Sequence, residues 1–106
     1  MSESITKMLS DFFQALGHPT RIEILELLKD KDTMCVCEIV EKLKKDQSSI
    51  SRHLSTLKRE GMVEFRGEGI RSFYRIKNEN IYKIIDLVKS ILRNEIKENQ
   101  KILAAF

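Results

Sequence analysis

The chain has 106 residues, 42% of them hydrophobic and 33% charged, and its formal net charge is +3 at pH 7. This composition is typical of one folded domain rather than a disordered chain, so we expect a single domain over residues 1–106. No apolar run approaches the roughly 20 residues that a membrane-spanning helix needs, and no secretory leader is recognisable. We therefore expect a cytoplasmic protein without a membrane partner.

The first part of the chain predicts two helices. Apolar residues recur at helical spacing over residues 5–16, which predicts an amphipathic helix. Gly17 and the His-Pro pair after it end this helix, and Pro19 suits the first turn of the next one because its missing N–H costs nothing there. Apolar side chains cover more than half the circumference of this second helix over residues 22–28, so we expect it in the centre of the core. The polar run 29–32 is expected to end it.

The middle of the chain predicts two short helices joined by a tight polar turn. The first covers about residues 36–44. Asp46 is a good N-cap for the second, which Gly61 ends. Apolar residues at every third or fourth position turn one face of this second helix inward, and serine, arginine and threonine occupy the other face.

A β-hairpin and a long helix complete the chain. Residues 62–66 alternate, residues 67–69 (Gly-Glu-Gly) form a turn, and residues 70–76 are rich in aromatic and β-branched side chains. An apolar stripe from Ile81 to about Asn99 predicts the last helix. The order α-α-α-α-β-β-α, mainly α with a small β-hairpin, is that of a winged helix-turn-helix domain. Because the first and last helices are more apolar than a monomer of this size easily covers, we expect a homodimer.

Charge and residue type around the fourth helix indicate double-stranded DNA as a partner. Residues 48–77 contain seven basic and three acidic residues, whereas residues 1–47 contain seven basic and nine acidic ones. Small hydroxyls allow close approach to the major groove, and arginine binds guanine or phosphate. A merely solvated face and, more remotely, a protein-interaction module without DNA binding are the alternatives. The expected DNA contacts are Gln47, Ser48, Ser49, Ser51, Arg52, His53 and Ser55 in the helix, with Arg66, Arg71 and, as a further candidate, Arg75 in the hairpin.

Neither histidine predicts catalysis. His53 is expected to flank the core or to contact a phosphate, and His18 to shape the turn between the first two helices. Ser51 and His53 lie two positions apart on a helix and so face away from each other. The sequence contains no glycine-rich phosphate loop and no paired-carboxylate signature. We therefore do not expect an enzyme.

Three segments together resemble one family. Residues 15–25 (Ala-Leu-Gly-His-Pro-Thr-Arg-Ile-Glu-Ile-Leu), residues 48–54 (Ser-Ser-Ile-Ser-Arg-His-Leu) and the hairpin are similar to the ArsR/SmtB family of winged-helix repressors, over about residues 12–96. The resemblance implies a homodimer closed through the first and last helices, with the fourth helix in the major groove of an imperfect palindromic operator. It also implies that a ligand releases the DNA. Residues 47–49 and 51–53 match the family's DNA-reading stretch.

Cys35 and Cys37 resemble the thiol motif of the arsenic-responsive branch of that family. Val40 stands where the best-known version has a third cysteine, residues 1–16 supply no further cysteine, and Asp86 has no histidine around it in the last helix. Two thiolates suffice for Hg(II) or Cu(I), or for two bonds to As(III) with a third ligand from outside, whereas tetrahedral Zn(II) needs four donors. We expect no permanently bound cofactor, and As(III) or another thiophilic ion as the inducer at Cys35 and Cys37.

Other uses of the two cysteines are open. Positions i and i+2 of an α-helix lie about 200° apart, so one ion bound by both should unwind the first turn of the third helix. The helix N-terminus should favour thiolate, which makes a redox or sulfur sensor an alternative. A direct disulfide between Cys35 and Cys37 should be strained and is disfavoured. In a third interpretation the family member has no metal site and the cysteines are small buried residues.

Overall fold

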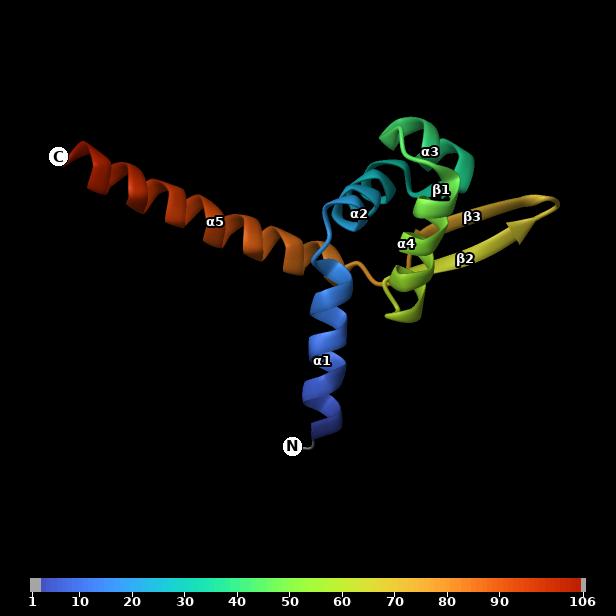
Figure 1. The fold of residues 1–106 in the computed structure, drawn as a ribbon, viewed down its shortest axis with the longest axis horizontal. Coiled ribbons are helices and arrows are strands. Elements are labelled where there is room, and N and C mark those ends of the chain that lie inside the picture. Colours follow the sequence, from blue (N-terminus) through green and yellow to red (C-terminus); the bar gives the residue numbers. More distant parts are fainter. Residues whose placement is uncertain (1–2, 106) are drawn as a thin grey trace.

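The computed structural model describes residues 3–105. The predicted helices and the hairpin are confirmed, and a short strand, β1, is present that the sequence patterns did not predict. Along the chain the elements are α1 (Glu3–Leu16), α2 (Pro19–Lys31), β1 (Thr33–Cys35), α3 (Val36–Leu43), α4 (Gln47–Arg59), β2 (Val63–Glu68), β3 (Arg71–Ile76) and α5 (Asn80–Ala104) (Figure 1).

The junction between α1 and α2 is built around His18. Its backbone is extended and its Nδ1 accepts the N–H of Thr20 at 3.1 Å, so His18 caps α2, and its predicted role in this turn is confirmed. The prediction that α2 ends within the polar run 29–32 is confirmed. The helix continues to Lys31, and Asp32, with φ of 67°, leaves it. Lysine is a good helix former and these side chains are exposed, so the helix extends through most of the run before it ends.

The three strands form one antiparallel sheet in the order β1-β3-β2. β2 and β3 are the predicted hairpin, with Val63 opposite Ile76. The turn predicted at residues 67–69 lies at residues 69 and 70 instead, because Gly67 continues β2 by pairing with Ser72. β1 pairs with the other edge of β3, which places Cys35 opposite Phe73. Three residues are too few to show an alternating pattern, and the partner strand lies far along the chain, so no local signal indicated β1. As a result, Cys35 is part of the sheet and not of the third helix.

The core lies between α2, α3, α4 and the base of the sheet. α2 is central, as predicted, although Ile22 turns outward and is 37% exposed. Deletion of a buried methyl group here costs stability, because the cavity left behind is only partly refilled. The largest side chains that are fully buried are Ile24, Leu25, Leu28, Met34, Ile39, Ile50, Leu54, Leu57, Met62 and Val63.

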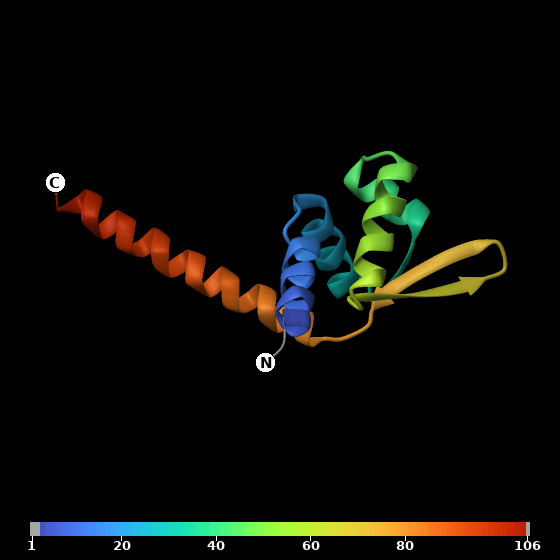
Figure 2. The ribbon, with the colours of Figure 1, turned by 60° about the horizontal axis from the view of Figure 1, so that its bottom comes forward.

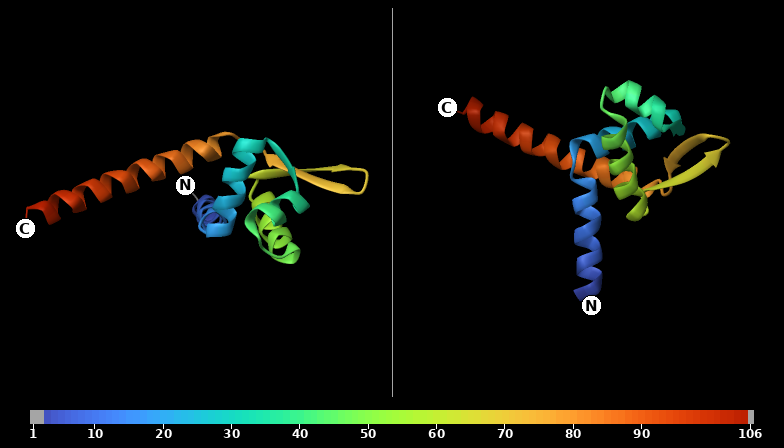
Figure 3. Two further views of the ribbon diagram at one scale, coloured as in Figure 1. Left: turned by 90° about the horizontal axis from the view of Figure 1, so that it is seen from above. Right: turned by 45° about the vertical axis from the view of Figure 1, so that its right-hand side comes forward.

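Two helices extend from this core and leave apolar side chains uncovered. Figures 1 and 2 show α5 projecting to one side of the core and the hairpin to the other, and Figure 3 shows the same arrangement from two further directions. An apolar groove of about 420 Å³ lies between α1, α2 and α5 and includes Phe13, Ile22, Val88 and Leu92. No helix in the described part of the chain is both long and apolar enough to cross a membrane. The exposed apolar residues include Ile5, Met8, Leu9 and Phe13 of α1, and Leu87, Val88, Ile91, Leu92 and Ile96 of α5.

Candidate DNA-reading surface and cysteine pair

The start of α4 is fixed by Asp46. Its carboxylate accepts the backbone N–H of Ser49 at 3.0 Å and the hydroxyl of Ser48 at 2.5 Å. These bonds, the one from Ser48 first, lower the pKa of Asp46 below its ordinary value, so the cap stays ionised at neutral pH. The predicted N-cap is confirmed. The cap thus takes the hydroxyl of Ser48 but only the backbone N–H of Ser49, and the ionised carboxylate of Asp46 occupies the helix N-terminus that would otherwise attract a phosphate.

The polar residues of α4 divide between three directions. Ser48, Arg52 and Ser55 are exposed on the side opposite the buried residues of this helix. Gln47 and Ser51 line a cavity that α4 shares with α3 and β3. The outward residues and the two cavity residues therefore present the surface that the sequence assigns to the major groove.

His53 points in the third direction, toward α2. Its Nδ1 accepts the Nε–H of Arg21 at 3.1 Å, and its ring lies 4.4 Å from that of His18, measured between centroids. The same Arg21 donates through Nη1 to the carbonyls of Ala15, at 3.2 Å, and Gln14. His53 thus links α4 to the α1–α2 junction, in agreement with its predicted place beside the core. Nothing in this arrangement tests its second predicted role, the phosphate contact.

Stability should fall as the pH drops below about 6.5, and His53 should be responsible. Burial, followed by the charges of His18 and Arg21, lowers the pKa of His53 in the folded protein below the ordinary 6.5. The unfolded chain therefore binds a proton at this residue before the folded protein does. The stabilisation is fully present above pH 6.5 and is lost as the pH falls from 6.5 toward the lower folded pKa.

Urea unfolding at about pH 7.5 and about pH 5.5 measures this effect. His53→Asn keeps an acceptor for Arg21 but cannot bind a proton, so its free energy of unfolding should change less between the two pH values than that of the wild type. Equal changes in the two proteins would contradict the assignment to His53.

Of the three predicted arginines in the hairpin, two are exposed and one forms an ion pair across the strands. Arg66 on β2 and Arg71 on β3 are exposed. Arg75, the further candidate, donates through Nε to Glu64 at 2.5 Å, its partner in the β2–β3 register, and this bond lowers the pKa of Glu64. An ion pair across the strands therefore holds Arg75, which leaves Arg66 and Arg71 as the better placed of the three for phosphate contacts.

The cysteines are joined in a disulfide, which corrects the expectation that this bond is disfavoured. Cys35 is the N-cap of α3, with φ of −80° and ψ of 159°, and Cys37 lies in the first turn. Because Cys35 is extended and outside the helix, the 200° separation of helical positions does not apply, and the two Cα atoms lie 5.4 Å apart, within the range of ordinary disulfides. The assumption that both cysteines are helical is wrong for the same reason, whereas the expectation that an ion bound by both unwinds the first turn of α3 stays a prediction.

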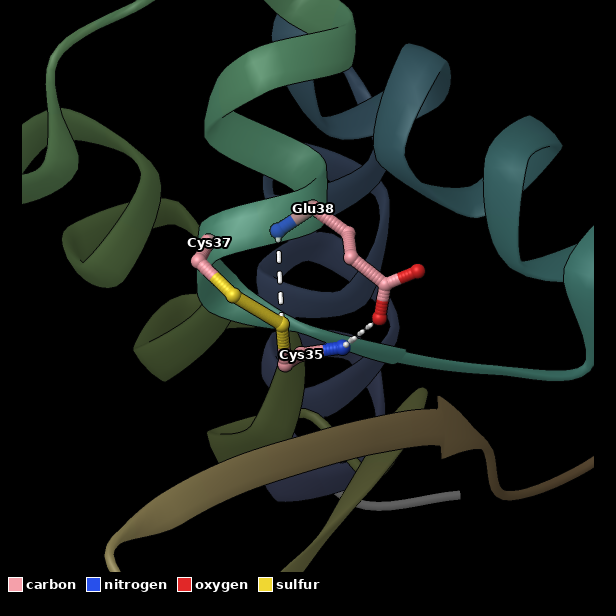
Figure 4. Close-up of a disulfide and its surroundings, with 3 residues drawn as sticks. All are labelled: Cys35, Cys37 and Glu38. Atoms are coloured by element: carbon pink, nitrogen blue, oxygen red, sulfur yellow. Dashed lines mark hydrogen bonds between the residues drawn. A yellow bond between two sulfur atoms is a disulfide. The ribbon is translucent and has the colours of Figure 1, made fainter.

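Glu38 completes this local structure (Figure 4). Its backbone N–H donates to the Sγ of Cys35 at 3.4 Å, and its carboxylate accepts the N–H of Cys35 at 3.0 Å. This is a capping box with cysteine in the place usually taken by serine or threonine. Sequence reasoning missed Glu38, although its position three residues after Cys35 is the spacing of that motif.

The cysteine pair borders the candidate DNA-reading surface of α4 and the hairpin directly. A cavity of about 300 Å³ is formed where α3, α4 and β3 meet. Within the described residues, no group of three or more His, Cys, Asp or Glu side chains could hold a metal ion, so this place offers two sulfurs and no third ligand of those types. The residues lining the cavity are Cys35, Val36, Cys37, Gln47, Ser51, Ile70, Arg71, Ser72 and Tyr74.

Comparison with known proteins agrees with this arrangement. Residues 18–64, which run from the α2 cap through the reading helix, match the model of the bacterial regulatory protein arsR family. An uncharacterised HTH-type transcriptional regulator of Methanocaldococcus jannaschii is 45% identical over 82 residues, 77% of this chain and 92% of that protein. The chain belongs to the ArsR family. It is a transcriptional regulator with the winged helix-turn-helix fold.

Two further proteins similar to this chain are informative, one named for cadmium resistance and one described as a homodimer. The cadmium resistance transcriptional regulatory protein CadC of Listeria innocua is 33% identical over 77% of this chain and 69% of its own length. The homodimeric winged helix-turn-helix DNA-binding domain Mb0332 of Mycobacterium bovis, a possible ArsR-family regulator, superimposes with a TM-score of 0.79 at 27% identity, covering 92% of this chain and 93% of that one.

Proposed function

We propose that the protein is a homodimeric repressor that holds a palindromic operator through α4 and the hairpin and releases it when As(III), or another thiophilic ion, binds the reduced Cys35 and Cys37. One observation carries this proposal: the cavity beside the two sulfurs is lined by Gln47, Ser51 and Arg71. A ligand bound to the cysteines therefore lies next to three expected DNA contacts. No long-range conformational change is needed to couple the two.

The homodimer is supported by the uncovered apolar faces. Leucine and isoleucine side chains along α1 and α5, and a valine on α5, are exposed in the single chain, and the apolar groove between α1, α2 and α5 adjoins them. Exposed apolar patches of this kind mark interaction sites. A second copy related by a two-fold axis covers them with the same residues. Mb0332, which has the same fold, is described as a homodimer. Two copies then present two reading helices to the two halves of the operator.

The ion is supported by the number and softness of the donors. Reduction of the disulfide leaves two sulfurs on neighbouring parts of the chain, one at the cap and one in the first turn of α3. Thiolates select soft ions, and As(III) accepts a third ligand from solvent. CadC, which is similar to this chain, is named for cadmium resistance.

A second candidate is a disulfide switch. The observation that favours it is the Cys35–Cys37 bond itself, which the fold accommodates through the extended cap. In this case oxidation and reduction, rather than ion binding, set the affinity for the operator.

Fluorescence anisotropy on the DNA upstream of the gene tests both candidates. With the cysteines reduced, the wild type should bind the DNA and arsenite should weaken binding by at least about tenfold, a change of roughly 1.4 kcal/mol. The Cys35→Ser/Cys37→Ser protein should bind equally well and ignore arsenite.

The comparison of reduced and oxidised wild type separates the two candidates. Binding that changes on oxidation but not with arsenite, Hg(II) or Cu(I) would replace the ion by the disulfide switch. Binding by the wild type that no ion and no oxidant changes would contradict both.

A further inference from the structure

We propose that the oxidised cysteine pair is a modification site for small anionic thiols. A thiol of this class opens the disulfide by attacking Cys37 and remains there as a mixed disulfide in the cavity between α3, α4 and β3. This inference rests on the proposed thiol dependence of the regulator and specifies which sulfur reacts and with what class of molecule.

The two sulfurs differ in accessibility. Cys35 is 2% exposed, since it lies in β1 and caps α3, whereas Cys37 is exposed in the first turn of the helix. An attacking thiolate has to reach the sulfur it bonds to. Accessibility therefore directs the attack to Cys37.

The two sulfurs also differ as leaving groups. The Sγ of Cys35 already accepts the N–H of Glu38 at 3.4 Å, at the N-terminus of an eight-residue helix (Figure 4). Both the hydrogen bond and the helix dipole stabilise a negative charge there, against the cost of burial. The carboxylate of Glu38 opposes this charge but is bonded to the backbone N–H of Cys35.

The step balances without an added oxidant. The sulfur of the incoming thiolate forms a bond to the Sγ of Cys37, the bond between the two cysteine sulfurs breaks, and its electron pair stays on the Sγ of Cys35 as a thiolate. The number of disulfide bonds is unchanged: the sulfur of Cys35 is reduced to the thiolate level, the sulfur of the incoming thiol is oxidised to the disulfide level, and Cys37 stays at the disulfide level. The reverse attack by Cys35 on Cys37 expels the small thiol and restores the starting state.

The cavity selects the class of thiol. Its volume of about 300 Å³ equals that of about ten water molecules in the liquid, which is room for a small organic thiol. Among the described residues that line it, Arg71 is the only charged side chain, and Gln47, Ser51 and Ser72 add hydrogen-bonding groups. A carboxylate on the thiol therefore meets a guanidinium and several donors, whereas an ammonium group meets a like charge.

The test uses the oxidised protein of residues 1–106 and three small thiols: 3-mercaptopropionate (anionic), 2-mercaptoethanol (neutral) and cysteamine (cationic). Reactions are quenched with acid, free thiols are alkylated, and the adduct is located by peptide mass spectrometry. The adduct should lie on Cys37 with Cys35 alkylated, and the anionic thiol should react at least about threefold faster than the cationic one at equal thiolate concentration.

Arg71→Gln supplies the decisive control, with Arg66→Gln on the neighbouring strand as the matched loss of one positive charge. The preference for 3-mercaptopropionate should disappear in Arg71→Gln and persist in Arg66→Gln. An adduct mapped to Cys35, a faster reaction with cysteamine, or the same loss of preference in both variants would overturn the proposal.

A DNA-binding measurement on the same samples separates this inference from the proposed function. Adduct formation on Cys37 with unchanged operator affinity would retain the modification site and reject thiol control of transcription. An operator affinity that depends on the disulfide, without any Cys37 adduct, would retain that control and reject the modification site.

Discussion

Replacing Ser51 and Arg52 together by alanine should remove sequence-specific DNA binding while the fold and the proposed dimer persist. Arg52 is exposed on the outward face of α4, and Ser51 lies one position before it, beside the cavity. A good bidentate contact between a side chain and a base is worth about 1–3 kcal/mol, and a dimer makes each contact twice. The affinity for the operator should therefore fall by about two orders of magnitude or more.

The measurement is fluorescence anisotropy at several salt concentrations, with the oligomeric state checked by sedimentation. Loss of phosphate contacts also flattens the dependence of the binding constant on salt, by about 0.9 in log–log slope for each contact. Lys97→Ala is the matched control, because it removes one positive charge from α5, which Figure 1 shows extending away from α4. A double variant that binds like the wild type would show that α4 is not the reading helix.

Leu92→Glu should convert the proposed dimer to a monomer and thereby weaken operator binding. Leu92 is 55% exposed in the single chain and lines the apolar groove with Phe13 and Val88. In a two-fold dimer that covers this groove, the substitution buries two carboxylates without partners, at a cost of several kcal/mol. We expect the dissociation constant of the dimer to rise by about a thousandfold or more.

Sedimentation equilibrium at micromolar concentration measures this change, and urea unfolding checks that the monomer remains folded. Asn94→Glu serves as the control, because it adds the same charge at an exposed position of α5 outside the groove. If Leu92→Glu stays dimeric, the interface lies elsewhere on the surface.

The order of the elements was largely predictable because each helix and the hairpin carry their own local signal. The helical spacing of apolar residues in α4 and the capping group of Asp46 together specify where that helix begins and which face turns inward. The residues on the outward face of α4 could be predicted in the same way, because burial of Ile50, Leu54 and Leu57 leaves the opposite face exposed.

Where several elements compete for one residue, local patterns were insufficient. The sequence placed the end of α2 only within the run 29–32, and the structure places it at Lys31, before the positive φ of Asp32. Arg75 was a further candidate for a DNA contact. The β2–β3 register, however, places Glu64 opposite Arg75, and the guanidinium of Arg75 forms an ion pair with that carboxylate. Neither outcome has a signal in a short stretch of sequence.

By itself, the sequence determined the winged-helix order, the polar face of α4 and the two cysteines at the entrance to α3. Helical periodicity, capping chemistry and residue identity are local properties, so they can be recognised without the tertiary structure. Only the tertiary structure decided how those thiols lie. Pairing of β1 with β3 holds Cys35 extended, which brings it to Cys37 and places both beside Gln47, Ser51 and Arg71. That juxtaposition depends on contacts between distant parts of the chain, which no local pattern encodes.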